Sequence, residues 1–199
     1  ESFLKKEPIF INKVVLQSNY TPENILQREN QVESMAGILA PALRFEKPSN
    51  IFIYGKVGSG KSVSVTYVVK GLLQTAQKNN ISLKAFYLNC KLKRMTDTEY
   101  RLIAQLAREF GVDIPATGLP TGEVYKRFVD VLEKEKILLL IILDEVDQLV
   151  FKIGDSVLYT LIRINSELKN SQISIIGISN DLVFADNLDP RIKSSLSEE

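Results

Sequence analysis

The chain has 199 residues, of which 45% are apolar, and this length and composition suit one α/β domain with a sizeable buried core. Its 25 Lys and Arg against 24 Asp and Glu leave a net charge of +1, which excludes a global basic field, so nucleic-acid binding would need a local patch. The absence of histidine excludes a histidine-based triad and histidine-ligated zinc within the chain, while the single cysteine, Cys90, excludes an intramolecular disulfide and is expected to be a small buried residue.

The first part of the chain is expected to begin with an extended arm. Residues 1–30 carry scattered apolar positions that are broken by Pro8 and Pro22, a pattern that predicts an arm with a short helix near Lys5. Helical spacing of apolar residues and one short apolar run predict the next elements. These are a helix over 29–45, a strand over 51–54 and a helix over 62–78.

Strands and helices alternate through the rest of the chain. The predicted strands cover 83–88, 137–143 and 173–178. The predicted helices cover 98–110, 157–168 and 188–196, and a further helix begins after Thr121 as its cap. Gly111 is expected to end the helix over 98–110. This alternation predicts a parallel sheet between two layers of helices, with 137–143 as a central strand. That longest apolar run is too short to cross a bilayer, and the start of the chain lacks a signal-peptide pattern, so a cytoplasmic protein without a membrane partner is expected.

A glycine-rich loop follows the first predicted strand. Residues 55–62 read Gly-Lys-Val-Gly-Ser-Gly-Lys-Ser, which matches G-x-x-x-x-G-K-S with a strand before it and a helix after it. Glycine allows successive N–H groups to converge on a polyphosphate at the start of a helix. The residues expected to hold the phosphates are Gly55, Val57, Gly58, Ser59, Gly60, Lys61 and Ser62. The alternative is a chance glycine-rich turn, which the flanking strand and helix disfavour.

An acidic motif, Asp144-Glu145-Val-Asp147, ends the central apolar strand. Next to a phosphate loop, Asp144 is expected to bind Mg²⁺ together with Ser62, and Glu145 is expected to orient or deprotonate a water that attacks the γ-phosphate. Taken alone, the two carboxylates are equally consistent with a solvated turn. Asp147 is expected to cap the following turn or to pair with a neighbouring base rather than to join the chemistry.

Asn180 closes the last long predicted strand, and its side chain is expected at the same sheet edge as Asp144. There it would contact the attacking water or the γ-phosphate. The alternative, which spacing alone does not disfavour, is an asparagine that starts a turn before Asp181.

Together these motifs resemble the AAA+ ATPases, and within that class the chain resembles the archaeal origin-recognition initiators, relatives of Orc and Cdc6 proteins. The resemblance covers nearly the whole chain and is carried by the loop over 55–62, Leu143-Asp-Glu-Val-Asp147, Ile178-Ser-Asn180, Ala40-Pro-Ala-Leu43 and Asp189-Pro-Arg-Ile-Lys-Ser-Ser-Leu196. It implies a three-layer α/β P-loop NTPase core over 31–199 with a central parallel sheet, and an arm over 1–30 near the adenine site.

The resemblance also implies roles for individual residues. Lys61 and Ser62 would hold phosphate and Mg²⁺, Asp144 and Glu145 would form the second acidic motif, and Asn180 would be the first sensor. Arg191 matches an arginine that acts in trans on a neighbour's nucleotide, with a helix-start salt bridge as the alternative. The residues expected against adenine are Ile25, Leu26 and Arg28.

The interval 91–136 resembles the helical insertion with which these initiators touch DNA. The loop between its two predicted helices is longer than a crossover needs, and its tip is expected to meet a minor groove and phosphates. The candidate contacts are Gly118, Leu119, Pro120 and Thr121. Bases in the same interval add positive charge, although such a run is more often a solvated face: Lys91, Lys93, Arg94, Arg101 and Arg108.

Initiators of this kind continue into a fifth strand, a helical lid with a second sensor arginine and a winged-helix domain. We expect all of these to lie outside this chain, which ends at Glu199. Turnover of ATP by this piece alone is therefore expected to be slow or absent, even where nucleotide binds.

The resemblance implies a Mg²⁺-dependent ATPase that recognises double-stranded origin DNA, assembles with other initiator subunits and supports loading of the replicative helicase, with ATP or ADP acting as the assembly switch. One alternative is a signalling or scaffold P-loop NTPase without DNA binding. Another is a clamp-loader-like ATPase, for which Ser-Arg-Cys would be expected in place of Asp189-Pro-Arg191.

Overall fold

A computed structural model of the chain describes residues 27–91, 97–115, 117–194 and 196–197. Several residues of the sequence predictions lie outside this described part: the arm up to residue 26 with its helix near Lys5, the adenine contacts Ile25 and Leu26, and the bases Lys93 and Arg94.

The centre of the described residues is a parallel sheet of five strands in the order β2-β3-β4-β1-β5. The strands are β1 (Asn50–Tyr54), β2 (Leu83–Asn89), β3 (Leu138–Asp144), β4 (Gln172–Ser179) and β5 (Leu196–Ser197). Because β1 and β3 both pair with β4, the segments that follow these three strands meet at one edge of the sheet. The phosphate loop, the acidic motif and Asn180 are these segments.

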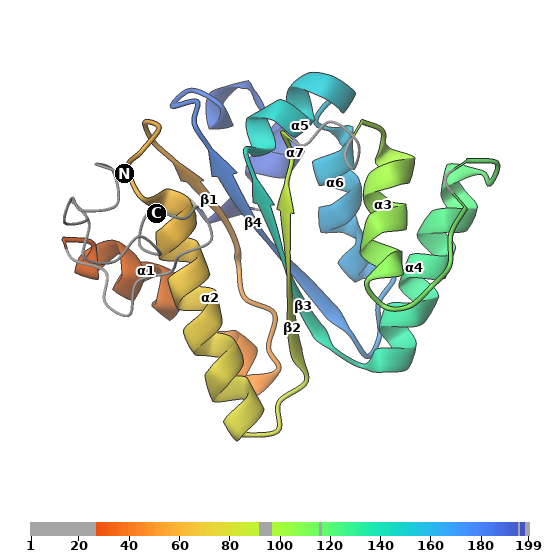
Figure 1. The fold of residues 1–199 in the computed structure, drawn as a ribbon, viewed down its shortest axis with the longest axis horizontal. Helices are drawn as coiled ribbons and strands as arrows, with labels where there is room; N and C mark the ends of the chain where they lie inside the picture. Colours follow the sequence, from red (N-terminus) through yellow and green to blue (C-terminus); the bar gives the residue numbers. More distant parts are fainter. Residues whose placement is uncertain (1–26, 92–96, 116, 195, 198–199) are drawn as a thin grey trace, which may run out of the picture.

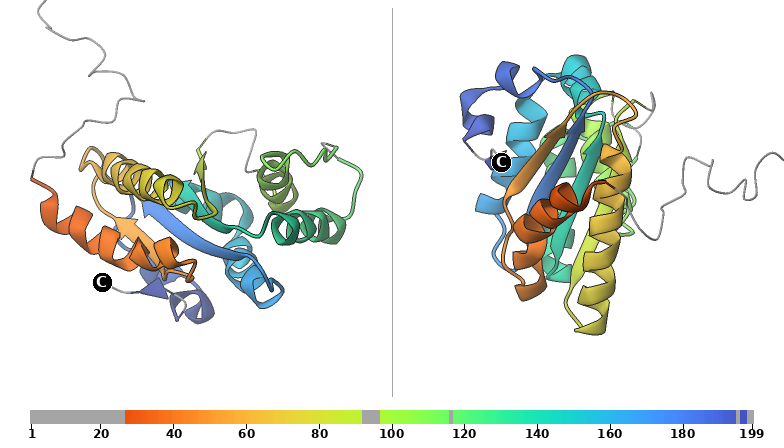
Figure 2. Two further views of the ribbon diagram at one scale, coloured as in Figure 1. Left: turned by 90° about the horizontal axis from the view of Figure 1, so that it is seen from below. Right: turned by 90° about the vertical axis from the view of Figure 1, so that its left-hand side faces the viewer.

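Helices cover both faces of this sheet, as predicted (Figures 1 and 2). On one face lie α1 (Glu29–Leu39), the 3-10 helix η3 (Ala40–Arg44) and α2 (Lys61–Lys78). On the other lie α3 (Glu99–Arg108), α4 (Thr121–Glu135), α5 (Val146–Ile153), α6 (Ser156–Arg163), the 3-10 turns η4 (Ile164–Ser166) and η5 (Ala185–Asn187), and α7 (Pro190–Lys193). The arrangement is a three-layer α/β fold. Among the described residues, no helix has both the length and the apolar character that crossing a membrane requires.

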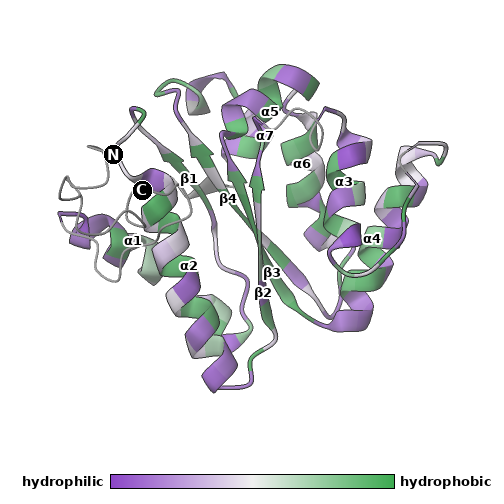
Figure 3. Cartoon of the chain, in the orientation of Figure 1, coloured by the Kyte–Doolittle hydropathy of each residue, from purple (hydrophilic) through white to green (hydrophobic). Residues whose placement is uncertain are grey.

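The central strand β3 is buried along its whole length, as expected for a parallel strand covered on both faces. Alternate side chains enter two separate hydrophobic cores, because successive residues of a strand point to opposite faces. Leu138, Leu140 and Ile142 pack with α1 and α2, whereas Leu139 and Ile141 pack with the helices of the other face. Figure 3 shows the hydrophobic character of the strands between these layers.

The helix ends show what the sequence predicted well and where it was wrong. Gly111 ends the segment of α3 at φ 75°, as predicted. Thr98, predicted as the first residue of this helix, instead caps it by accepting the N–H of Arg101 at 3.2 Å. Thr121, predicted as a cap, is instead the first residue of α4, and Pro120 stands in the cap position without a side-chain hydrogen bond to the helix. Proline fixes φ at a value that suits a helix entrance, so the start moves one residue back.

The expected helix over 188–196 is only partly present. Helix α7 ends at Lys193, and the chain is extended at 196–197, where β5 pairs with β1. The expectation that the chain stops before a fifth strand was therefore wrong. The serines after Lys193 disfavour continuation of the helix, because their hydroxyls compete for backbone hydrogen bonds. On the side of β1 away from β4, backbone N–H and C=O groups can pair with a further strand, and β5 pairs there.

Candidate functional site

The glycine-rich loop connects β1 to α2, as predicted. Gly58 and Gly60 adopt φ 77° and 83°, a region that disfavours residues with a Cβ, and Gly60 occupies the cap position of α2 without a side-chain hydrogen bond to the helix. A Cβ on Gly55 would lie 3.4 Å from the Ser59 hydroxyl. The first amides of an 18-residue helix therefore face the loop without a capping side chain, which is the arrangement that binds phosphate groups.

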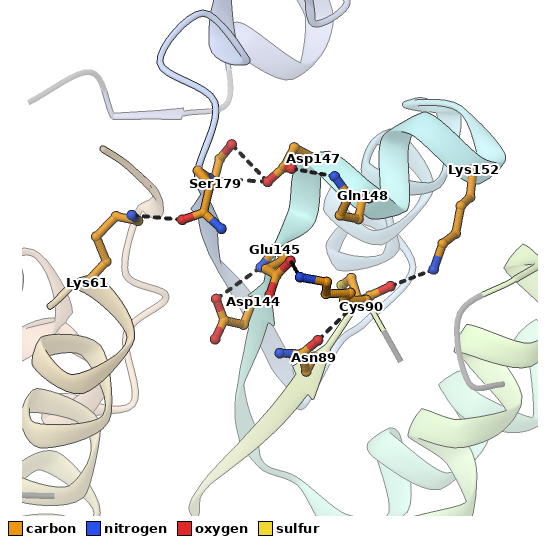
Figure 4. Close-up of polar contacts among 11 residues, drawn as sticks. Lys61, Asn89, Cys90, Asp144, Glu145, Asp147, Gln148, Lys152 and Ser179 are labelled. Carbon is orange, nitrogen blue, oxygen red and sulfur yellow. Dashed lines mark hydrogen bonds and ion pairs between the residues drawn. The ribbon is translucent and has the colours of Figure 1, made fainter. Parts of the chain in front are cut away.

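Lys61 joins this loop to the end of β4. Its ammonium donates hydrogen bonds to the carbonyl oxygens of Gly55 at 2.6 Å and Lys56 at 3.0 Å. It also donates to Asn180 Oδ1 at 3.0 Å, the contact drawn from Lys61 in Figure 4. A lysine held between a phosphate loop and a neighbouring strand end lies where the outer phosphates of a nucleotide would bind. The side chain of Asn180 thus lies at the phosphate loop, and its contact with a water or the γ-phosphate stays a prediction.

Asp144 ends β3 and is 8% exposed. Its Oδ1 accepts the backbone N–H of Glu145 at 3.0 Å, and its Oδ2 accepts the hydroxyl of Tyr87 from β2. Burial raises the pKa of Tyr87, as do the hydrogen bond and the charge of Asp144, whereas a hydrogen bond from Ser62 lowers it. Asp144, the predicted metal ligand of β3, is therefore held by a tyrosine of the neighbouring strand.

The two predicted ligands, Ser62 and Asp144, fit Mg²⁺. A serine hydroxyl and a carboxylate are hard oxygen donors, and Mg²⁺ typically takes one or two protein ligands and completes its octahedron with waters and phosphate oxygens. Within the described ranges, no group of three or more His, Cys, Asp or Glu side chains converges as a metal site. A divalent ion at Ser62 and Asp144 would therefore depend on nucleotide phosphates for further ligands.

Glu145 has a left-handed backbone, with φ 55° and ψ 47°, at the cap position of α5. This conformation is unfavourable for a residue with a Cβ, and such residues are concentrated at functional sites. Its carboxylate lies 3.6 Å from the ammonium of Lys91, whose backbone N–H is held by Asn89 at 3.0 Å (Figure 4). The predicted water-activating group is therefore held in an ion pair, and it is 21% exposed.

The contacts of Asp147 differ from both roles expected for it, and the sequence did not indicate them. Its Oδ1 accepts the Ser179 hydroxyl at 3.0 Å and the backbone N–H of Asn180 at 3.3 Å, while Oδ2 accepts the side-chain amide of Gln148 at 3.0 Å. The expected cap or ion pair was wrong because α5, an unpredicted helix, begins at Val146 and directs this carboxylate towards β4.

A cleft of about 490 Å³ opens beside the phosphate loop. Its lining includes Arg28, which was predicted as an adenine contact, and Lys61 and Tyr54. Gln31 and Ser34 of α1 also line it and were not predicted. The apolar spacing of the helix over 29–45 marked its buried side, but its contact with β1 and the phosphate loop depends on the fold. The cleft suits a flat base next to a phosphate site.

Arg191 lies in the first turn of α7 and forms the salt bridge that was weighed as its alternative role. Its Nε and Nη2 donate to Asp189 Oδ1 at 3.0 Å and Oδ2 at 2.8 Å, and its guanidinium lies 4.5 Å from the ring centroid of Tyr159. These hydrogen bonds lower the pKa of Asp189 to about 2 and raise that of Arg191. The guanidinium side chain is 65% exposed, so it remains accessible to another molecule.

The candidate DNA contacts lie at the loop before α4. Gly118 has φ 105°, and Pro120 and Thr121 are exposed, whereas Leu119 is half-buried against the core beneath α3 and α4. Figure 1 shows this loop on the same side of the molecule as the carboxyl ends of the strands. Two of the predicted bases support their own segment, because Arg108 donates to the Ile114 carbonyl at 2.7 Å and Arg101 pairs with Asp97 at 3.3 Å.

Comparisons with known proteins agree with this geometry. A family profile described as "AAA domain" matches residues 44–182. The ORC1-type DNA replication protein of Pyrococcus abyssi is 48% identical over 203 residues, which cover all of this chain and 48% of that protein. The ORC1-type DNA replication protein 1 of Methanosarcina mazei is 47% identical over 199 residues, with 100% and 47% of the two chains covered. The chain thus spans about half the length of the curated relatives it matches.

Solved structures give the same result. The Aeropyrum pernix ORC1 protein in complex with DNA superposes with a TM-score of 0.83 at 40% identity, over 93% of this chain and 47% of that one. The ORC2 protein of the same organism, in complexes with ADPNP and ADP, gives a TM-score of 0.80 at 26% identity, over 94% of this chain and 50% of that one. The chain therefore belongs to the AAA family of ATPases, and the relatives that it matches are archaeal proteins of the Orc1/Cdc6 type.

Proposed function

We propose that this chain is the Mg²⁺-dependent ATP-binding part of a DNA replication initiator. The observation that carries the proposal is the hydrogen bond from Lys61 to Asn180 Oδ1 at 3.0 Å, because it joins the phosphate loop to the end of β4. Asp144 at the end of β3 and Ser62 at the start of α2 lie at the same edge of the sheet. A phosphate loop, a metal-binding carboxylate and a polar sensor at one edge suit ATP better than a ligand without phosphates.

In this proposal the loop residues Gly55, Val57, Gly58, Ser59 and Gly60 surround the phosphates at the start of α2, and Lys61 neutralises their charge. Arg28 contacts the base in the neighbouring cleft, together with Ile25 and Leu26 of the arm. Ser62 and Asp144 hold Mg²⁺, which supplies charge neutralisation and orients the phosphates when bound.

Hydrolysis requires Glu145 to orient or deprotonate a water and Asn180 to contact the γ-phosphate. In the structure the Glu145 carboxylate is paired with Lys91, which it must leave to reach a water. Asn180 binds Lys61 through its oxygen, so its NH₂ group can donate to the phosphate without breaking that contact. Arg191 completes the site of a neighbouring initiator subunit after it leaves Asp189. These rearrangements support slow turnover, with ATP acting as an assembly switch rather than as a continuous source of energy.

Origin recognition and helicase loading are proposed for the whole protein, of which this chain is the ATPase portion. The Aeropyrum pernix ORC1 protein, similar to this chain at 40% identity, was solved in complex with DNA. That similarity supports a duplex-DNA contact through Gly118, Leu119, Pro120 and Thr121. A protein of this kind acts on the chromosome, so we expect it in the cytoplasm.

The test is duplex-DNA binding by the full-length protein, wild type and Lys61→Ala, with and without ATP over a salt series. Origin recognition predicts tighter binding to origin DNA than to random DNA, with a preference that depends on ATP in the wild type and not in Lys61→Ala. Equal affinity for both DNAs under all conditions would contradict it.

A second arm separates the initiator from a scaffold NTPase without DNA binding. Replacing Leu119 and Pro120 with alanine should weaken duplex binding several-fold, whereas Thr117→Ala, an exposed change in the same loop, should not. Unchanged duplex-DNA binding after the double replacement would favour a scaffold NTPase without a role for this loop in DNA binding.

A further inference from the structure

Asp147 lies in the first turn of α5 and is bonded to the end of β4. Its Oδ1 accepts both the Ser179 hydroxyl at 3.0 Å and the backbone N–H of Asn180 at 3.3 Å. The paired register of β1 and β4 ends at Tyr54 and Ser179, so Asn180 is the first residue beyond the ladder. The carboxylate of Asp147 therefore gives the Asn180 N–H the acceptor that the sheet no longer supplies.

The position of the Asn180 side chain depends on this support. Ser179 is 1% exposed and accepts the N–H of Asp181 at 3.0 Å, so its hydroxyl is bonded on both sides. Beyond it, Asn180 Oδ1 accepts the ammonium of Lys61 at 3.0 Å. With its oxygen directed at Lys61, Asn180 keeps its NH₂ group for another acceptor, because within the part of the chain that the structure describes this group has no hydrogen-bond acceptor, and a phosphate oxygen can fill that place.

Helix α5 is held at both ends, which keeps Asp147 in place. At its far end, Lys152 donates to the carbonyl of Cys90 at 2.9 Å, next to the end of β2 (Figure 4). At its near end, Asp147 bonds to β4. The helix thus contacts the segment after β2 at one end and the end of β4 at the other, and both contacts support the position of Asp147.

We propose that Asp147 is the positioning residue that sets the preference of the site for ATP over ADP through Asn180. The inference rests on the proposed nucleotide function. The phosphates common to ATP and ADP are bound by the loop and Lys61, which Asp147 does not touch. Only the γ-phosphate needs a donor from the end of β4, so loss of Asp147 weakens binding of ATP and leaves binding of ADP in place.

The test measures the affinities of ADP and of a non-hydrolysable ATP analogue, both with Mg²⁺, for the wild-type chain and for variants. Asp147→Ala should lower the ratio of analogue to ADP affinity about tenfold, with ADP affinity within about twofold, because one charge-assisted hydrogen bond and the order of Asn180 are lost. Asp147→Asn should have a smaller effect, since Oδ1 still accepts. Ser179→Ala should fall between the wild type and Asp147→Ala.

Gln148→Ala is the matched control. It removes the other hydrogen bond to the same carboxylate at Oδ2 without touching β4, and it should leave the ratio unchanged. If Asp147→Ala does not fold, Asp147→Asn and Ser179→Ala carry the test. In the full-length protein, Asp147→Ala, Asp147→Asn and Ser179→Ala should lower kcat more than they raise KM for ATP. The hydrogen bond from Asn180 is needed most in the transition state, where charge develops on the γ-phosphate.

An unchanged ratio in Asp147→Ala with intact ADP binding would overturn this inference and leave the nucleotide function standing. Equal losses for both nucleotides would also overturn it, because they would show a merely structural role. Failure of the wild type to bind either nucleotide would overturn the proposed function itself, and this inference with it.

Discussion

The hydroxyl of Tyr87 lies against Asp144, one of the two predicted metal ligands. It donates to Asp144 Oδ2, while Asp144 Oδ1 already accepts the N–H of Glu145, so both carboxylate oxygens are engaged. A divalent ion that coordinates Asp144, directly or through water, must share or displace the hydroxyl. Tyr87 therefore competes with Mg²⁺ for the carboxylate.

The variant Tyr87→Phe tests this competition. Loss of the hydroxyl should lower the Mg²⁺ concentration for half-maximal nucleotide binding roughly three- to tenfold, and should reduce the free energy of unfolding of the nucleotide-free chain by about 1 kcal/mol. A Mg²⁺ titration of fluorescent ADP binding measures the first effect, and urea unfolding measures the second. Tyr100→Phe, which loses a hydrogen bond to the Pro115 carbonyl outside the site, should change neither Mg²⁺ nor nucleotide binding. A higher Mg²⁺ requirement in Tyr87→Phe would show that the tyrosine supports the metal instead.

Site residues that stand in a sequence motif could be predicted, but the residues that contact them in the folded chain could not. The loop glycines, Asp144 and Asn180 stand in local patterns whose chemistry is explicit. Tyr87 stands only two residues before the end of a strand, and its contact with Asp144 depends on the pairing of β2 with β3. No local signal specifies which strands pair.

At the scale of elements, long and strongly patterned segments were predicted best. Strand β3 is a continuous apolar run and helices α2 and α3 have helical spacing of apolar residues, and the ends of all three lie within a few residues of the predicted ones. Helix α5 was missed because it is short and begins inside the acidic motif, although Val146, Leu149, Val150 and Ile153 have helical spacing. Strand β5 was missed because a strand of two residues is too short to show an alternating apolar pattern.

The close packing of β1 against β4 gives a stability prediction. A Cβ on Gly177 would lie 2.7 Å from Cε1 of Phe52, whose ring stacks on Phe184 with centroids 5.8 Å apart. Gly177→Ala should therefore destabilise the fold by about 1–3 kcal/mol, because the ring must leave its stack. Urea unfolding followed by circular dichroism measures the change.

Gly71→Ala is the matched control, since this glycine is exposed within α2 and a Cβ there would meet no atom within 4 Å. It should stabilise the chain by up to about 1 kcal/mol through helix propensity. A Gly177→Ala chain as stable as the wild type would contradict the close packing of Phe52 on β4.

At the scale of the whole molecule, strand order is what turns separate motifs into a site. The phosphate loop, the acidic motif and Asn180 are separated by many residues in the sequence, but β1, β4 and β3 are neighbours in the sheet. Alternation of strands and helices predicted the layers, and the family resemblance predicted the roles. The contacts among the three segments come from the sheet order, which periodicity cannot supply.

In the proposed function, α7 is the surface that would meet a neighbouring subunit. Arg191 of α7 is paired with Asp189, and its guanidinium lies over the ring of Tyr159. To act on a neighbour's nucleotide, the guanidinium would have to leave the Asp189 carboxylate and bind a phosphate instead. The loop before α4 lies at the far end of the described residues from α1 (Figures 1 and 2). Nucleotide, neighbour and DNA would thus meet different surfaces of one fold.

The most direct test of the central claim is calorimetric titration of the chain with ADP and with a non-hydrolysable ATP analogue in the presence of Mg²⁺, for the wild type and Lys61→Ala. We expect saturable binding of one nucleotide per wild-type chain. The affinity of Lys61→Ala should be at least about tenfold weaker, because this variant lacks the ammonium that joins the phosphate loop to Asn180. Equal affinities for the two chains, or no binding by a folded wild type, would contradict it.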